Sequence, residues 1–137
     1  MKLFSRLLLA FSAIVLVGGA YLHTSGFNRM SAAVAKSDLV PFVGKGLKVL
    51  WLQDSVIAIV LGIIFGTIAA RGSAAPRWII VVLGLIPVAT AGFVYHFIGN
   101  FIGGHVFLTA GVAAILGGPF VSRKRTGLTA FKRRTGL

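Results

Sequence analysis

One acid and three histidines are the side chains most able to carry chemistry in this otherwise apolar chain. The 137 residues contain two acids, Asp38 and Asp54, and Asp54 lies inside a long apolar stretch. The histidines are His23, His96 and His105. A carboxylate with imidazoles can bind a divalent metal ion or relay protons near neutral pH. Two histidines at equal depth on facing helices can also ligate a haem iron.

Several other chemistries are excluded. The chain has no cysteine, so it forms no disulfide, thiolate metal site or iron–sulfur cluster. It contains no phosphate-binding glycine loop, no nucleophile elbow and no zinc-protease motif. Asp38 and Asp54 fall on different predicted elements, which argues against catalysis by a carboxylate pair. We therefore expect no enzyme and no cofactor, with metal or haem binding kept as an alternative.

The composition is that of a membrane protein. The hydrophobic fraction is 57% and the mean hydropathy is +0.96, whereas soluble domains are about 45–50% apolar. A soluble domain of this size could not bury so much apolar surface. The net charge of +12 would indicate nucleic acid in a soluble protein. Here the basic residues flank apolar stretches, so anionic lipid headgroups are the expected partner and nucleic acid is not.

Four apolar stretches are long enough to cross a bilayer, which takes about 20 residues. They predict an all-α membrane protein, a bundle of four transmembrane helices in a single domain (1–121), at about 3–22, 47–70, 78–97 and 101–121. A basic tail follows at 122–137. Between the first two helices, Ser31–Lys36 could form one or two turns of interfacial helix.

The Lys and Arg residues predict the orientation, because they accumulate on the cytoplasmic side. If both termini are cytoplasmic, most of the Lys and Arg residues lie on the cytoplasmic side, including all those of the tail. We therefore expect both termini in the cytoplasm and the tail in contact with anionic headgroups. In an alternative interpretation, Leu7–Val17 followed by Gly18–Ala20 is a cleaved signal peptide. That alternative leaves the rest of the topology unchanged.

This topology brings the candidate residues to a common depth in the outer leaflet. Asp54 would lie roughly 10 Å inside the second helix, at 1.5 Å per residue. All three histidines fall at helix ends on the same side. The candidate polar site therefore comprises Asp54, His105, His23, His96, Gln53 and Tyr95. The alternative is that Asp54 makes one buried hydrogen bond that fixes the helix register.

Small residues predict where the helices pack. On the second helix, Ala58, Gly62 and Gly66 follow Asp54 at steps of four and include a GxxxG motif, which permits close approach of another helix. The shared face predicts that Asp54 points into the bundle rather than at lipid. A matching stripe on the fourth helix consists of Ala110, Ala114 and Gly118.

The layout resembles small bacterial inner-membrane proteins of four helices that have no assigned activity. The likeness rests on Tyr21–His23, on Trp51–Asp54 and on Gly103–His105. It implies a fold and a bacterial inner membrane, but no reaction. We therefore expect a non-enzymatic structural or accessory component that associates with itself or with a partner membrane subunit. The alternatives are a proton-coupled carrier or channel that uses the Asp/His cluster, and a metal- or haem-binding protein.

Overall fold

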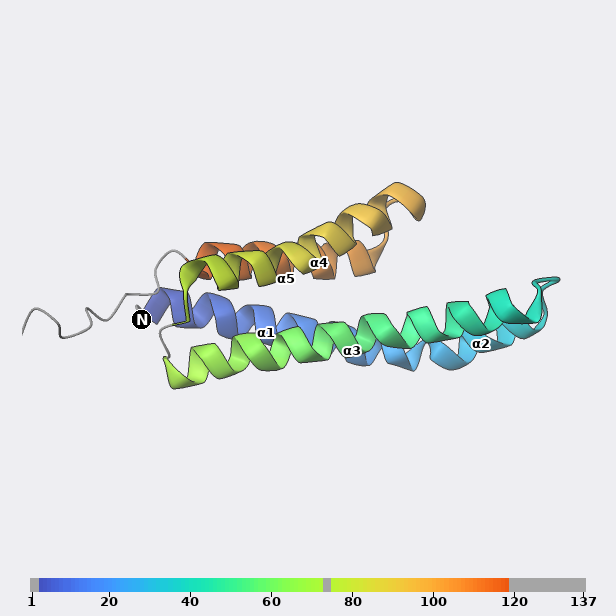
Figure 1. The fold of residues 1–137 in the computed structure, drawn as a ribbon, viewed down its shortest axis with the longest axis horizontal. Coiled ribbons are helices and arrows are strands. Elements are labelled where there is room, and N and C mark those ends of the chain that lie inside the picture. The colour runs from blue at the N-terminus through green and yellow to red at the C-terminus, as the bar shows by residue number, and fades with distance from the viewer. Residues whose placement is uncertain (1–2, 73–74, 119–137) are drawn as a thin grey trace, which may run out of the picture.

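The chain is helical throughout the part that the structure describes. The computed structural model describes residues 3–72 and 75–118, which form five α-helices and no strand (Figure 1). These are α1 (Leu3–Ser25), α2 (Phe27–Ala35), α3 (Pro41–Arg71), α4 (Arg77–Phe97) and α5 (Ile102–Gly117). The expected all-α fold is confirmed. The predicted tail at 122–137 lies outside the described residues, as does the predicted end of the fourth helix at 121.

Three helical segments are long and apolar enough to cross a membrane. They are α1 continued into α2 with 33 residues, α3 with 31 and α4 with 21. Helix α5 is as apolar but has 16 residues, or about 24 Å at 1.5 Å per residue. Because a hydrocarbon core is about 30 Å thick, the described part of α5 does not reach across it.

Proline and glycine determine where several helices begin and end. Pro41 occupies the first turn of α3, where its missing N–H costs nothing. Gly72 ends α3 with φ +58°, and Gly99 has φ +90° in the turn between α4 and α5. Both glycines therefore adopt a left-handed conformation that other residues rarely accept.

Helix α3 begins well before the expected start at residue 47, and the mixed segment before it is also largely helical. Gly44 is buried, and a Cβ there would lie 3.0 Å from Val34 Cγ1 of α2. This close approach packs α2 against the start of α3. Helices in proteins are stabilised mainly by such packing, which the hydropathy of the sequence does not reveal.

The helices form a row with α1 between α3 and α5. Helix α4 packs on the other side of α5 and hardly contacts α3. We call α1, α2 and α3 the long hairpin, and α4 with α5 the short hairpin. Figure 1 shows the short hairpin alongside one part of the long hairpin, which extends beyond it. The Arg71 end of the bundle is where α3 ends and α4 begins, and the His23 end is opposite.

Small residues on α3 let it pack closely on α1. Ala58 and Gly62 are buried. A Cβ at Gly62 would lie 2.8 Å from Val17 Cγ2 and 3.2 Å from Ala13 O, and one at Gly66 would lie 3.5 Å from Ala13 Cβ. The GxxxG segment of α3 therefore faces the middle of α1.

The short hairpin has its own close contact between glycines. A Cβ at Gly84 of α4 would lie 3.2 Å from Gly111 O, and a Cβ at Gly111 of α5 would lie 2.8 Å from Gly84 O. On α5, Ala110 and Ala114 are fully buried and Gly118 is buried just after the helix. The two helices can approach this closely because neither side chain intervenes.

Two buried serines tie α1 to α5. Ser5 Oγ donates to Gly117 O at 2.6 Å, and Ser12 Oγ donates to Ala110 O at 2.9 Å. Both serines have 0% exposure. Because a buried hydroxyl without a partner is costly, these bonds favour one alignment of the two helices.

Arg6 caps the end of α3. Its Nε donates to Ala69 O at 2.8 Å and its Nη2 donates to Ala70 O at 3.0 Å. These carbonyls belong to the last turn, where C=O groups find no N–H donor within the helix. The guanidinium also complements the negative end of the helix dipole.

Candidate ligand-binding pocket

His23 and Trp51 hold α1 and α3 together at the His23 end. Their rings stack with centroids 4.1 Å apart and planes 15° apart. Trp51 Nε1 donates to His23 O at 3.0 Å, and His23 Nε2 bonds Trp51 O at 3.1 Å. Since a carbonyl oxygen can only accept, Nε2 carries a proton in this bond. Gly26 leaves room for the indole, because a Cβ there would lie 3.2 Å from Trp51 Cζ2.

By helix length, this pair lies one bilayer thickness from the opposite end of α1 and α3. About 20 helical residues cover the roughly 30 Å of a hydrocarbon core. Counted from Arg71, they reach Trp51, and counted from Leu3, they reach His23. On this count Asp54 lies about 5 Å inside Trp51 along α3, at 1.5 Å per residue, and α3 continues beyond both residues to Pro41.

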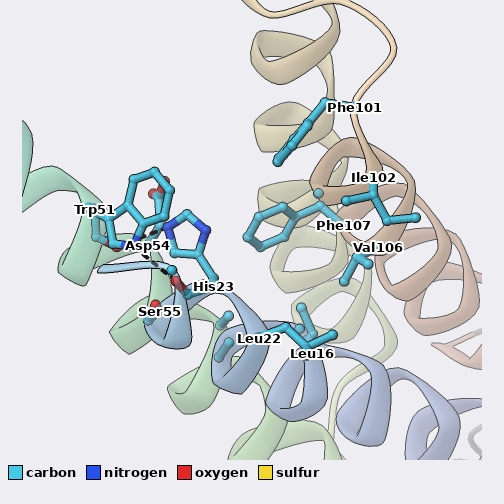
Figure 2. Close-up of a pocket in the computed structure, with 15 residues that line it drawn as sticks. Leu16, Leu22, His23, Trp51, Asp54, Ser55, Phe101, Ile102, Val106 and Phe107 are labelled. Atoms are coloured by element: carbon cyan, nitrogen blue, oxygen red, sulfur yellow. Dashed lines mark hydrogen bonds between the residues drawn. The ribbon is translucent and has the colours of Figure 1, made fainter. Parts of the chain in front are cut away.

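A pocket of about 250 Å³ opens between the two hairpins at this depth (Figure 2). Helix α1 provides its floor, α3 one side and the beginning of α5 the other. Most of its lining is apolar, and its polar groups lie on the α1 and α3 side. The residues that matter most here are His23, Trp51, Asp54, Ser55, Phe101 and Phe107.

Ser55 is the most informative residue of the pocket. It is 4% exposed, and its Oγ is the one buried side-chain N or O atom without a hydrogen bond in the described residues. Helical Ser and Thr commonly bond the carbonyl four residues earlier, as Thr90 does with Ile86 O at 3.1 Å. Ser55 makes no such bond, so its buried hydroxyl has no partner within the described residues.

Asp54 lies beside Ser55 but is exposed rather than enclosed between helices. It lines the pocket, yet within the described chain its carboxylate has no hydrogen bond or ion pair. The small-residue face places Ala58 and Gly62 against α1, but Asp54 lies at the edge of that face. Gln53 is also exposed and does not line the pocket.

His105 belongs to a different cluster, formed within the short hairpin. Tyr95 Oη donates to His105 Nδ1 at 2.7 Å, and His105 Nε2 donates to Asn100 Oδ1 at 2.7 Å. Gly104 allows this arrangement, since a Cβ there would lie 2.7 Å from Tyr95 Cε1. Both imidazole nitrogens are therefore engaged in joining the end of α4 to the start of α5.

His96 belongs to neither cluster. Its ring lies nearly perpendicular to that of Phe97, with centroids 4.6 Å apart, and it is exposed. The six expected site residues are thus divided: His23 and Asp54 at the pocket, His105 and Tyr95 in the short hairpin, and His96 and Gln53 on the surface. No group of three or more His, Cys, Asp or Glu residues could hold a metal ion within the described residues.

Sequence reasoning missed Ser55, Phe101 and Phe107. The position of Ser55, three residues before Ala58 and beside Asp54, is the signal that could have identified it. Nothing in the sequence indicates that the two phenylalanines lie across a pocket from α3, because that depends on how the hairpins diverge. Comparisons with protein-family models, curated proteins and solved structures found no match to this chain.

Proposed function

We propose that this protein is a non-enzymatic accessory component of a bacterial inner membrane that binds a small apolar or amphipathic molecule between its long and short hairpins. Both termini lie in the cytoplasm in this proposal, and the pocket lies in the outer half of the membrane. The clustering of Lys and Arg at the Arg71 end and in the sequence of the tail supports that orientation.

The observation that carries the proposal is the unpartnered Ser55 hydroxyl in the pocket wall. Leaving such a group unsatisfied costs about 1–3 kcal/mol, whereas the other described buried serines, Ser5 and Ser12, have partners. A bound molecule with one polar group would satisfy Ser55, and its apolar part would cover Phe107 and Val106.

A binding role is favoured over proton-coupled transport. Transport through an Asp/His cluster would require proton exchange between Asp54 and His105. The observed hydrogen bonds argue against such an exchange. The two ring nitrogens of His105 bond Tyr95 and Asn100, and Asp54 has no hydrogen bond to His105 in the described residues.

Tryptophan fluorescence tests the proposal, because the chain has two tryptophans and one of them, Trp51, lines the pocket. Trp78→Phe leaves Trp51 as the sole reporter in nanodiscs of zwitterionic lipid. Bromooctanol, a neutral amphiphile whose bromine quenches indole on contact, is titrated into the sample. We expect quenching of Trp51 that saturates, because the pocket holds a limited number of molecules.

Trp51→Phe is the matched control, since it leaves Trp78, which is 67% exposed on α4 and outside the pocket. Its quenching should rise linearly with the probe concentration in the lipid. Linear quenching of both reporters would overturn the proposal. So would a saturating curve at Trp78 alone.

A further inference from the structure

We infer that the pocket selects a protonated alkylamine, with its ammonium group beside Asp54 and Ser55 and its alkyl chain against the start of α5. This inference rests on the proposed binding function and adds the chemical class of the ligand. It follows from the charge of the pocket, from the free hydroxyl and from the pocket's size.

The charge of the pocket favours a cation. Asp54 is the one charged residue among those that line it, and no Lys or Arg takes part. The carboxylate has no protein partner in the described chain. An unpaired carboxylate within the hydrocarbon layer is costly and is usually retained with a partner or a role. A ligand ammonium would supply that partner, whereas an anionic ligand would be repelled.

The hydroxyl and the aromatic rings favour a cation that carries an N–H. Ser55 Oγ can accept a hydrogen bond from the N–H of a protonated amine. A quaternary ammonium has no N–H and cannot donate such a bond. Trp51 and Phe101 add ring faces or edges around the same volume, and cations bind favourably over aromatic faces. Figure 2 shows Trp51, Asp54 and Ser55 on one side, with Phe101 and Phe107 on the other.

The size of the pocket fits a head group with a short alkyl segment. Its volume of about 250 Å³ lies between a cavity of about 150 Å³ that binds benzene and the roughly 300–1,000 Å³ of drug-sized sites. It is too small for a whole phospholipid. The lining on the α5 side, Ile102, Val106 and Phe107, is apolar and suits the chain.

The test is displacement of bromooctanol from the Trp78→Phe protein by four octyl competitors. These are octylamine, octyltrimethylammonium, octanol and octanoate, which share the chain and differ in the head group. We expect octylamine to compete at about tenfold lower concentration than octanol, because a charge-assisted hydrogen bond is the stronger kind. Octyltrimethylammonium should fall between them, and octanoate should be weakest.

Asp54→Asn should remove the preference for octylamine over octanol, and Asp54→Glu should retain most of it. Asp38→Asn is the matched control, because it removes the chain's other carboxylate from the exposed turn between α2 and α3. It should leave the preference unchanged. Since the Asp54 side chain is exposed, the Asn variant should fold, and unaltered Trp51 emission would verify this.

The outcomes separate this inference from the function on which it rests. If bromooctanol saturates but octylamine competes no better than octanol, the pocket binds ligands and the amine assignment is wrong. The assignment is also wrong if Asp54→Asn keeps the preference or if octanoate competes best. If bromooctanol never saturates at Trp51, the proposed function fails, and the inference fails with it.

Discussion

At the scale of single residues, three buried serines differ in what their hydroxyls do. Ser5 and Ser12 of α1 each donate to a carbonyl of α5, while Ser55 of α3 has no partner. Intramolecular hydrogen bonds contribute about 0.5–1.5 kcal/mol net, whereas an unsatisfied buried group costs its desolvation. The first two hydroxyls therefore stabilise the bundle, whereas the third, without a partner in the described residues, lowers its stability.

This difference predicts opposite effects of the same substitution. Ser12→Ala should lower the free energy of unfolding by about 0.5–1 kcal/mol, because it loses an interhelical hydrogen bond. Ser55→Ala should leave it unchanged or raise it by up to about 1 kcal/mol, because no bond is lost and alanine favours the helix. Reversible unfolding in mixed micelles with rising dodecyl sulfate measures both. Equal losses in the two variants would mean that Ser55 is bonded in the ligand-free protein.

The sequence predicts a depth for the polar residues but does not predict their partners. Counting along an apolar stretch locates Asp54 near one boundary, because the rise per residue is constant. Whether Asp54 meets His105 depends on helix rotation and on which helices are neighbours. His105 instead bonds Tyr95 and Asn100, residues close to it in sequence and brought near by the tight turn at Gly99.

At the scale of elements, glycine determines how closely helices pair. Gly84 and Gly111 approach so closely that a Cβ on either would meet backbone atoms of the other helix, whereas a Cβ at Gly92, also on α4, would meet nothing within 4 Å. Backbone cannot move aside as a flexible side chain can. The contact between α4 and α5 therefore depends on Gly84 and Gly111, but not on Gly92.

We therefore expect Gly111→Ala to destabilise the protein by about 1–3 kcal/mol, as overpacking does in cores. The added Cβ would lie 2.6 Å from Val88 Cγ2 and 3.0 Å from Val88 N. Gly92→Ala is the control and should be neutral or stabilise by up to about 1 kcal/mol, because alanine favours the helix more than glycine. Unfolding in mixed micelles again provides the measurement. Similar stabilities for both variants would contradict the close packing of α4 on α5.

The ends of the helices were predicted only where the sequence itself marks them. Helix α4 follows Pro76 and ends at Phe97, just before Gly99 and Asn100, so turn-forming residues make both limits visible in the sequence. The start of α3 at Pro41 lies before the apolar stretch. Proline is common in the first turn of a helix, but the packing of Val34 over Gly44 that supports this early start cannot be seen in the hydropathy. That contact joins α2 to α3 across the turn between them, so it depends on how the two helices pack.

At the scale of the whole molecule, the row α3–α1–α5–α4 leaves the bundle open. In a closed bundle each helix has two neighbours, but here α3 and α4 hardly meet. The short hairpin joins the long one chiefly through α1 and α5, along the face that contains Ser5, Ser12 and Gly117. The pocket lies where this contact ends, at the His23 end.

The arrangement predicts which turns share a side of the membrane. The turn before α3 and the turn between α4 and α5 lie at the His23 end, while α3 ends and α4 begins at the Arg71 end (Figure 1). Because the chain has no cysteine, single cysteines can report on each. Ser37→Cys and Ile98→Cys should react with an impermeant maleimide added outside intact cells, and Ala75→Cys only after permeabilisation.

The labelling would contradict the account in two ways. If Ser37→Cys and Ile98→Cys react from opposite sides, α4 does not cross the membrane as the structure implies. If Ala75→Cys alone reacts from outside, the helices cross as described, but the proposed cytoplasmic location of the termini is inverted.

Photo-crosslinking tests most directly whether a ligand occupies the space between the hairpins. Octylamine with a diazirine in its chain is irradiated with the wild-type protein in nanodiscs, and the modified residues are mapped by mass spectrometry. We expect adducts within residues 19–26, 51–58 and 101–107, suppressed by excess octylamine. Adducts spread over lipid-exposed residues such as Trp78 and Leu85, without suppression, would contradict the proposed binding.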